Sequence, residues 1–270
     1  MSQPFPGGLF DAAHHCLMQT AVMQKLLVTE AVARAWERGE LALAGDSRVE
    51  SIEDAGRPPR PELVASFQLP ARNIGRREGH AAFIHALAHI EFNAINLAWD
   101  AVYRFRDLPR GFYDDWVRIA REEAAHFRLL QGYLAELGYA YGDFPAHDNL
   151  WRMARDTAAD ALMRMALVPR VLEARGLDVT PGMIERLAHQ GQQRAVEILQ
   201  VIYRDEIGHV AAGSRWFRFL CRQRGLDPEA HFQALIEHHA RQRIRPPLNR
   251  QGRDAAGFSP AELNYLEALL

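Results

Sequence analysis

The sequence predicts an all-α protein built around a four-helix bundle that carries a dinuclear metal site. Four long segments of helical character lie between residues 76 and 226, and no stretch shows the alternating pattern of a strand. One carboxylate–histidine pattern occurs twice on these segments, with a lone Glu followed 32 or 33 residues later by Glu-x-x-His. Two lone Glu and two Glu-x-x-His pairs are the donor set of a carboxylate-bridged dinuclear site in a bundle core.

Length and composition limit the fold and its partners. The 270 residues suit one domain with elaborations, and 48% hydrophobic residues can form a sizeable core. The formal net charge of −2 gives no general attraction to nucleic acid or to an anionic membrane. Cys16 and Cys221 are too few and too far apart for a disulfide framework, a Cys-based zinc site or a rubredoxin-type iron centre.

Targeting and membrane-spanning segments are not expected. The first residues contain no basic region that leads into an apolar run, and no apolar stretch reaches the ~18 residues of a membrane span. We therefore expect a cytoplasmic protein with no signal peptide and no membrane partner.

The first 75 residues are expected to form a helix and a strap laid over the bundle. Residues 9–38 are predicted to form one helix that ends near Gly39. Residues 42–75 contain four prolines and few periodic apolar positions, which favours an extended backbone over a helix. We place the first domain boundary between this region, residues 1–75, and the bundle.

The bundle itself is predicted over residues 76–226. Its long helices are expected at about 76–105, 112–137, 149–175 and 192–224. We expect the third helix to end at Gly176 and a short helix to begin at Thr180-Pro181, an N-cap followed by a first-turn proline. The interval from Glu123 to Glu173 is 50 residues, which matches a long crossover between two antiparallel helix pairs.

Residues 227–270 are predicted to be a helical extension packed on the bundle. An Asp-Pro and a Ser-Pro pair each place an N-cap before a first-turn proline, and Glu262 completes a capping box at the second pair. The two helices and the basic, proline-interrupted segment between them are expected at residues 228–240, 260–269 and 241–253.

Six side chains are the candidate metal ligands: Glu91, Glu123, His126, Glu173, Glu206 and His209. Because positions i and i+3 lie on one helix face, each Glu-x-x-His directs a carboxylate and an imidazole to one point. The flanking positions are apolar at helical spacing, which disfavours the alternative of a solvated surface pair. Buried carboxylates cost several kcal/mol each without compensating charge, so these faces predict bound cations.

Glu173 has an open alternative. It lies shortly before the predicted helix end at Gly176, where it could cap the helix, with Asp156 or Asp160 as the replacement ligand. The other histidines near the first lone Glu are expected to pack rather than to bind metal, because their direction or height on the helix differs: His80, His85 and His89.

An acid stands immediately before each Glu-x-x-His pair. Histidine ligands donate their second ring N–H to a carboxylate, and we assign this role to Glu122 and Asp205. Tyr203 lies one turn from Glu206 on the same face. It is either a hydrogen-bond donor or radical-forming residue of the site, or an ordinary buried tyrosine.

Four stretches of the chain resemble an uncharacterised bacterial family of the ferritin-like superfamily, and the resemblance runs from about residue 57 to the C-terminus. They are LAHIEFNAINLAWDAVYRF (87–105), REEAAHFRLL (121–130), MALVPRVLEARGLDVTPGM (165–183) and RDEIGHVAAGSRWF (204–217). The resemblance implies a ferritin-like fold and a metal site that includes Glu173, but no particular reaction. The REEAAHF segment and the ligand order are more distantly similar to the di-iron hydroxylase that modifies isopentenyl-adenosine in transfer RNA.

Oxygen and imidazole ligands without thiolate favour two iron ions, with manganese or a mixed Mn/Fe pair as alternatives. The leading hypothesis is a di-iron oxidase or oxygenase that uses dioxygen, an electron donor and an unknown organic substrate. A peroxide-scavenging di-manganese enzyme, an iron-storage or detoxification protein, and a helical interaction module with a vestigial site are the alternatives. The oligomeric state stays open, with a homodimer as one alternative.

RNA is one candidate substrate class, because the segment 241–253 is rich in arginine. Its candidate phosphate contacts are Arg241, Arg243, Arg245, Arg250 and Arg253. The alternative interpretation is a solvated basic loop.

Overall fold

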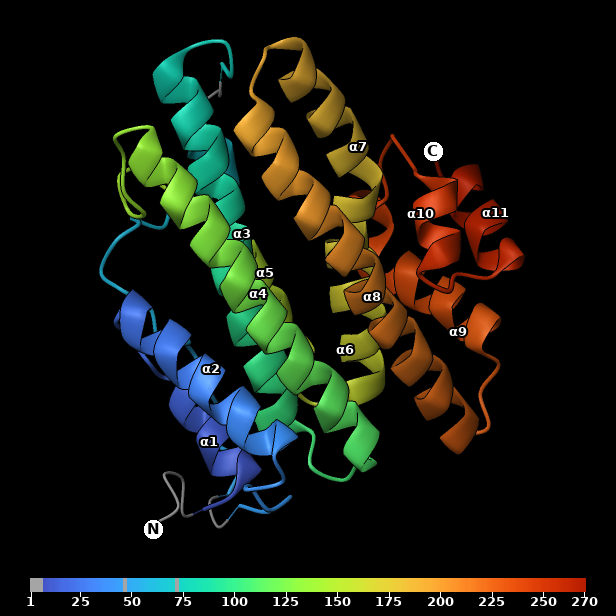
Figure 1. Ribbon diagram of the computed structural model, residues 1–270. Helices are drawn as coiled ribbons and strands as arrows, with labels where there is room; N and C mark the ends of the chain where they lie inside the picture. Colours follow the sequence, from blue (N-terminus) through green and yellow to red (C-terminus); the bar gives the residue numbers. More distant parts are fainter. Residues whose placement is uncertain (1–6, 46–47, 71–72) are drawn as a thin grey trace. The chain divides into compact units, whose positions relative to one another are not determined.

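The computed structural model describes residues 7–45, 48–70 and 73–270, and its regular structure is helical (Figure 1). Within these ranges the β pairing consists of one isolated bridge between Leu63 and Ala146, so the predicted all-α class is confirmed. The chain divides into two compact units, Met1–Arg155 and Asp156–Leu270. None of the helices in the described ranges is both long enough and apolar enough to cross a membrane.

The first unit is built around a long antiparallel helix pair. Its helices are α1 (Leu9–Leu17), α2 (Val22–Glu37), α3 (Arg77–Arg104), α4 (Arg110–Glu136) and α5 (Asn149–Asp156), whose last residue crosses the division. Helices α3 and α4 pack side by side, α1 packs on α3, and α2 packs on α4 (Figure 1). The guanidinium of Arg77 donates to the carbonyl of Leu137 at 2.8 Å, which joins the start of α3 to the end of α4.

Helix α3 is the central element of this unit. All residues from 91 to 103 are buried, as expected for a helix that is covered on every side. The apolar side chains of this stretch account for most of that burial, but polar side chains, Glu91 among them, are buried with them. Buried polar groups require partners, so α3 is where a functional site can be sought.

The N-terminal helix differs from the prediction. One helix was expected over residues 9–38, but the chain turns after α1 and begins again as α2 at Val22. Lys25 of α2 compensates for the break: its Nζ donates to the last carbonyls of α1, those of Cys16 at 3.0 Å and Leu17 at 2.8 Å, and to Asn96 Oδ1 at 2.6 Å. This buried lysine satisfies carbonyls that a helix end leaves without intrahelical partners.

The predicted strap is present between α2 and α3. It is non-helical in the described ranges apart from a short 3-10 turn, η1 (Ser66–Gln68). Backbone hydrogen bonds join it to the segment after α4, from Val64 N to the carbonyl of Ala146 at 2.8 Å and from Ala146 N to the carbonyl of Glu62 at 2.9 Å. The indole of Trp151 donates to the carbonyl of Glu53 at 2.8 Å. These contacts fix the strap to the first unit.

The second unit consists of one interrupted helical run, one long helix and a C-terminal group. The run is α6 (Ala161–Leu167), η2 (Val168–Glu173), which is π-helical, and α7 (Ala174–His189). The long helix is α8 (Gln193–Gln223), on which α6, η2 and α7 all pack. The C-terminal group is α9 (Pro228–Leu235), η3 (Ile236–Ala240), η4 (Arg241–Arg243), α10 (Arg250–Ala255) and α11 (Pro260–Ala268).

The third predicted helix begins where expected, but the structure differs from the prediction in its interior and at its end. It was expected over 149–175, but the chain leaves the helix between α5 and α6, where Asp160 caps α6 by accepting the N–H of Leu162 at 2.9 Å. It was expected to stop at Gly176, but α7 continues through Pro181. Proline removes one helical N–H, and the carbonyl of Leu177, four residues earlier, accepts instead from Asn249 Nδ2 at 3.0 Å. This tertiary bond supports the helix where the sequence signals its end.

The π-helical η2 lies close against α8. A Cβ on Gly213 would stand 2.3 Å from Cγ of Pro169, so this approach requires glycine. Pro169 is inside the helical run and donates no backbone hydrogen bond, and the wider π-turn accommodates it. The sequence pair Pro169 and Gly213 therefore sets how closely the two elements pack.

Two buried ion pairs hold the C-terminal group to the helical run. Arg170 of η2 is 0% exposed, and its Nη2 lies 2.6 Å from Glu262 Oε2 of α11. Arg253 of α10 donates to both carboxylate oxygens of Asp178, at 2.9 and 2.7 Å. Three aromatic rings also surround the Arg170 guanidinium, at 4.1 to 4.7 Å from Cζ to the ring centroids: Phe217, Phe232 and Phe258.

Helix starts in the C-terminal group follow the sequence closely. Asp227 accepts the N–H of Ala230 at 2.7 Å, and Ser259 and Glu262 form the predicted capping box. The segment 241–253, predicted to be a loop, contains the short helix α10 instead. Asn249 caps it by accepting the N–H of Gly252 at 3.0 Å, which is an N-cap that the sequence prediction missed.

Candidate metal site

Three of the candidate ligands meet inside the first unit. Glu91 comes from α3, and Glu123 and His126 come from adjacent turns of α4, which packs on α3. The Nδ1 atom of His126 lies 3.2 Å from Glu91 Oε2 and 3.3 Å from Glu123 Oε2. Each of the three side chains offers one ligand atom, and these atoms lie within 4.8 Å of one another. Such a group could hold a metal ion.

Burial makes this group electrostatically demanding. The exposed fractions of Glu91, Glu123 and His126 are 4%, 0% and 1%. Burial raises the pKa of Glu91 well above its ordinary value, and the nearby negative charge of Glu123 raises it further. The His126 imidazole opposes this rise by hydrogen bonding to the Glu91 carboxylate.

The donor chemistry fits a divalent cation. Two carboxylates and one imidazole nitrogen converge without any thiolate, which suits iron or manganese and also permits other divalent ions. A cation among them would offset the repulsion between two carboxylates that water does not reach. The identity of the metal does not follow from these three residues.

The second Glu-x-x-His pair is formed inside the second unit. Glu206 and His209 occupy adjacent turns of α8, with Nδ1 of His209 3.5 Å from Glu206 Oε1. His209 is 0% exposed, and the side chain of Glu206 is 13% exposed. The spacing rule therefore places these two donors on one face, as it does in α4.

Glu173, the remaining ligand of the prediction, is the last residue of η2. It lies within the continuous run from α6 to α7, and η2 packs on α8. Its predicted replacement, Asp160, is committed elsewhere: besides capping α6 it binds Arg224 at 2.6 Å. Asp156, the other replacement, is the last residue of α5, before the break in the chain.

The two acids predicted to orient the histidines have arginine partners on their own helices. Glu122 accepts from Arg118 Nη1 at 2.6 Å, and Asp205 accepts from Arg204 Nε at 3.0 Å. Their role toward the histidines stays a prediction.

Tyr203 is tied to the C-terminal group. Its hydroxyl accepts from Asn249 Nδ2 at 2.8 Å, so this tyrosine supports the cap of α10. That contact accounts for the residue without a role in redox chemistry, and its proposed role at the metal site stays a prediction.

The neighbouring histidines of α3 pack as expected. Nε2 of His80 lies 2.9 Å from the hydroxyl of Tyr133, and Nε2 of His85 accepts the N–H of Gly142 at 2.9 Å. His89 Nδ1 lies 2.8 Å from the hydroxyl of Tyr141. Burial lowers the pKa of His89 to about 4, so its imidazole is neutral near pH 7.

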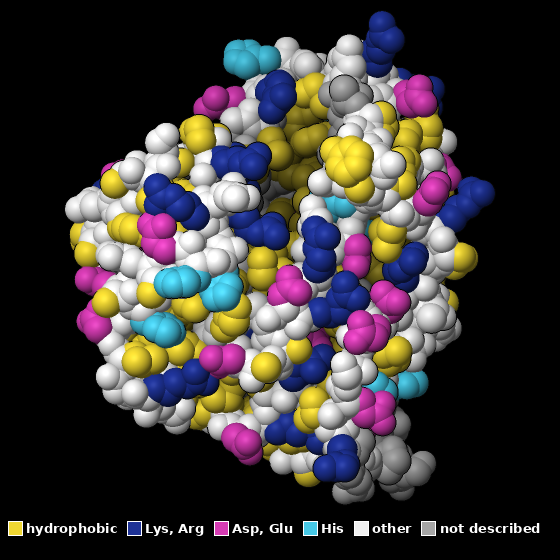
Figure 2. Space-filling model, turned by 180° about the vertical axis from the view of Figure 1, so that it is seen from behind, with side chains coloured by type: hydrophobic (Ala, Val, Ile, Leu, Met, Phe, Trp, Pro, Cys, Tyr) yellow, Lys and Arg dark blue, Asp and Glu magenta, His cyan; other side chains and the backbone are white. Residues whose placement is uncertain are grey.

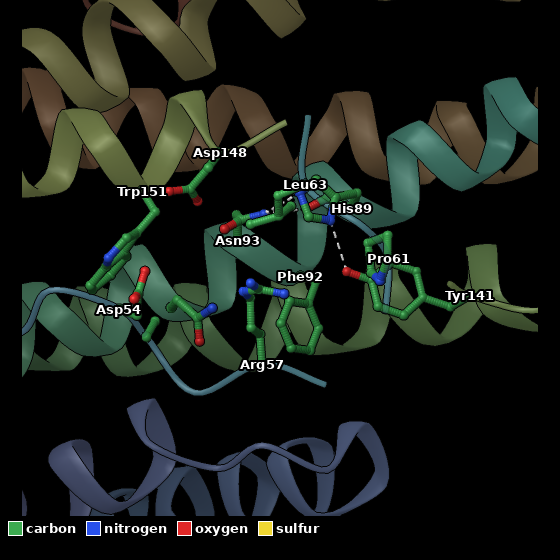
Figure 3. A pocket seen from close by; sticks show the side chains of 12 residues that line it. Asp54, Arg57, Pro61, Leu63, His89, Phe92, Asn93, Tyr141, Asp148 and Trp151 are labelled. Atoms are coloured by element: carbon green, nitrogen blue, oxygen red, sulfur yellow. Dashed lines mark hydrogen bonds between the residues drawn. The ribbon is translucent and has the colours of Figure 1, made fainter. Parts of the chain in front are cut away.

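A pocket under the strap borders α3, and sequence reasoning missed it. Figure 3 shows Asp54, Arg57 and Pro61 of the strap facing His89 and Asn93 of α3. Free space amounts to about 10 Å³, which is room for about one water molecule. In this arrangement the pocket is filled by its own side chains and does not admit an organic substrate. The prolines of the strap indicated its extended backbone but not which residues of α3 it covers.

The predicted phosphate contacts fall into two groups. Arg253 is 2% exposed and paired with Asp178, and Arg250 binds Glu267 at 2.6 Å. The interpretation of Arg253 as a phosphate contact is therefore wrong, because its guanidinium is buried in an ion pair. Arg241, Arg243 and Arg245 are exposed.

Comparison with known proteins places the chain in a family. The model of the family described as "Protein of unknown function (DUF455)" matches residues 18–264. The chain belongs to this family. A protein of Haemophilus influenzae, named "Uncharacterized protein", is 48% identical over 216 residues, which cover 77% of this chain and 75% of that protein. No solved structure matches the chain. The predicted uncharacterised family is confirmed, and the comparison assigns no reaction.

Proposed function

We propose that this protein is a ferritin-like metalloenzyme with a dinuclear centre, most simply a di-iron oxidase or oxygenase that acts on an organic substrate. The observation that carries the proposal is the buried convergence of Glu91, Glu123 and His126 in the first unit. Two carboxylates and an imidazole enclosed in a helical core have no ordinary packing role, whereas they match one half of a dinuclear donor set.

The second unit supports the proposal because it repeats the arrangement. In the first unit a helix with a lone Glu packs on a helix with Glu-x-x-His. In the second unit, η2 with Glu173 packs on α8 with Glu206 and His209. We propose that these three side chains supply the other half of the donor set.

The residues of the chain have definite tasks in this proposal. The carboxylates would neutralise the metal charge, and neutral imidazoles would complete the coordination. Phe92 and Phe127, with ring centroids 5.6 Å apart, follow Glu91 and His126 in the sequence and exclude water from the neighbouring core. Bound iron would supply the activation of dioxygen. A substrate has to reach this core, and the filled pocket under the strap offers no open path for it.

Metal binding under anaerobic Fe(II) loading tests the proposal. We expect about two irons per chain in the wild-type protein and an optical change when air is admitted. His209→Ala and Glu123→Ala should each lower the metal content, whereas Glu185→Gln, at an exposed position of α7, should leave it unchanged.

The outcomes separate the alternatives. One metal per chain that His209→Ala leaves in place would confine the site to the first unit and refute the dinuclear proposal. Binding of manganese without reaction toward dioxygen would favour disproportionation of peroxide. Wild-type protein without stoichiometric metal would end the metal interpretation.

A further inference from the structure

A hollow on the surface of the second unit has the character of an anion site. It lies where the π-helical η3 passes into the 3-10 turn η4, and it has room for about 570 Å³. This volume is within the range of small-ligand sites, about 300–1,000 Å³. Its lining is cationic: Arg241, Arg243, Arg245, His238 and His239 contribute to it. Figure 2 shows one face of the molecule, on which a few histidine side chains lie close to one another. We call this feature the basic hollow.

The charge of the basic hollow is only partly compensated. Its one acidic residue, Glu237, accepts from Arg241 at 2.6 Å and from the hydroxyl of Tyr265 at 2.7 Å. Three arginines and one glutamate leave two formal positive charges, before any charge on the histidines. Within the described part of the chain, the side chain of Arg243 donates no hydrogen bond and forms no ion pair. Its guanidinium is available to a ligand.

The backbone that carries these arginines is held in place. Arg175 of α7 donates to three successive carbonyls, those of Arg245 at 2.7 Å, Pro246 at 2.9 Å and Pro247 at 2.8 Å. Arg245 Nε donates to the carbonyl of Gln242 at 3.0 Å. The Arg245 side chain thus bonds only within its own turn, and Arg175 holds the backbone of that turn in place. Arg245 therefore loses little conformational freedom when it binds an anion. Such clamping is not needed for a merely solvated basic loop.

We propose that the basic hollow binds a small phosphate-bearing ligand, an inorganic oligophosphate or a nucleoside di- or triphosphate. Arginine forks match phosphate oxygens in pairs, and clustered positive charges favour a ligand with several negative charges. A long nucleic acid is disfavoured because the charges do not continue along the chain: Arg250 and Arg253 are engaged in ion pairs, and the net charge of the protein is −2. The proposal goes beyond the metal site and does not depend on it.

Calorimetric titration of the full chain tests the proposal. The probes are inorganic triphosphate and ADP in metal-free buffer, at about 50 mM and about 200 mM salt. We expect saturable binding of at least one probe that weakens at the higher salt. If triphosphate binds at least as strongly as ADP, the phosphate groups alone are recognised. If ADP binds more strongly than triphosphate, the nucleoside contributes to the affinity.

Two variants locate the site. Arg243→Gln combined with Arg245→Gln should weaken binding by roughly tenfold or more, because charge-assisted bonds to phosphate are lost. Arg186→Gln removes an exposed arginine of α7 outside the hollow and should leave the affinity unchanged. Circular dichroism melts of both variants check that folding is preserved.

Three results would overturn the proposal. They are absence of binding by both probes, equal binding by the double variant, and preferential binding of a single-stranded RNA oligonucleotide over both probes. The last result would show that the hollow is part of a longer nucleic-acid surface.

Discussion

The buried pair of Arg170 and Glu262 gives a stability prediction that can be worked out from the structure. The two side chains are 0% and 2% exposed and their charged atoms are 2.6 Å apart. Burial lowers the pKa of Arg170, and the charge of Glu262 opposes this fall. The substitution Glu262→Gln removes the charge but keeps an oxygen that can accept the backbone N–H of Ser259, a bond of 2.9 Å in the capping box. The change therefore isolates the ion pair from the helix cap.

We expect Glu262→Gln to lower the free energy of unfolding by about 3 kcal/mol, because it leaves a buried guanidinium without a counter-charge. The three phenylalanine rings around Arg170 compensate only in part, since each cation–π contact contributes about 0.5–2 kcal/mol and is present before and after the change. In a background of Arg170→Met the guanidinium that pairs with Glu262 is absent, and the same change to Gln should cost less than about 1 kcal/mol.

Urea denaturation followed by far-UV circular dichroism measures all four proteins of this cycle. Equal slopes of the transitions allow their midpoints to be compared directly. A cost of Glu262→Gln below about 0.5 kcal/mol, or one that is the same in both backgrounds, would show that the pair does not hold the C-terminal group and would refute the reasoning.

Two further predictions concern one buried residue in each unit, Lys25 in the first and Gly213 in the second. Burial lowers the pKa of Lys25 to about 7 from 10.5, so between these values the unfolded chain holds a proton that the folded protein has released, and stability rises with pH. The free energy of unfolding, measured by urea denaturation, should rise between pH 7 and about pH 8.5 with a slope that approaches roughly 1.4 kcal/mol per pH unit. Lys25→Met should flatten this rise, and a slope unchanged by the substitution contradicts the assignment. The pH interval ends below 9.0, the ordinary pKa of a cysteine thiol, because Cys16 next to Lys25 would otherwise contribute to the slope: burial raises the pKa of its thiol in the folded protein. Gly213→Ala should lower the free energy of unfolding by about 2 kcal/mol, because the new methyl group meets Pro169. Gly176→Ala is the control: its new methyl group has no neighbour within 4 Å, so the change should be neutral or stabilising. Thermal melts compare the two variants, and equal melting temperatures would exclude the close approach of η2 and α8.

The sequence predicted the elements whose signals are local. The limits of α3, α4 and α8 follow from long apolar periodicity between Gly or Pro breaks. The caps at Asp227 and Ser259 form as predicted, since an N-cap needs only its own turn. The face shared by Glu123 and His126 follows from helix geometry alone.

The errors arose where distant residues supply what the local sequence lacks. Nothing near residue 18 signals the break between α1 and α2, which is stabilised by hydrogen bonds from Nζ of Lys25. The stop expected at Gly176 is overridden by Asn249, more than 70 residues away. The side chain of Arg253 is withdrawn from solvent by Asp178. A periodicity argument does not include such long-range partners, and this limits what it can say about the surface of the molecule.

Helix α7 owes its length to a side chain outside it. The carbonyl of Leu177 is deprived of its helical donor by Pro181, and Asn249 supplies the replacement. A chain that ended at residue 226 would therefore lack the donor, the Arg253 that binds Asp178 and the Glu262 that binds Arg170. In the helical run that carries Glu173, the Arg170 guanidinium and the Leu177 carbonyl would then lack partners, and Asp178 would keep only Arg175, at 3.7 Å. During synthesis this run therefore lacks these partners until residues 249–262 have left the ribosome, so we expect its packing to be completed only after that segment is made.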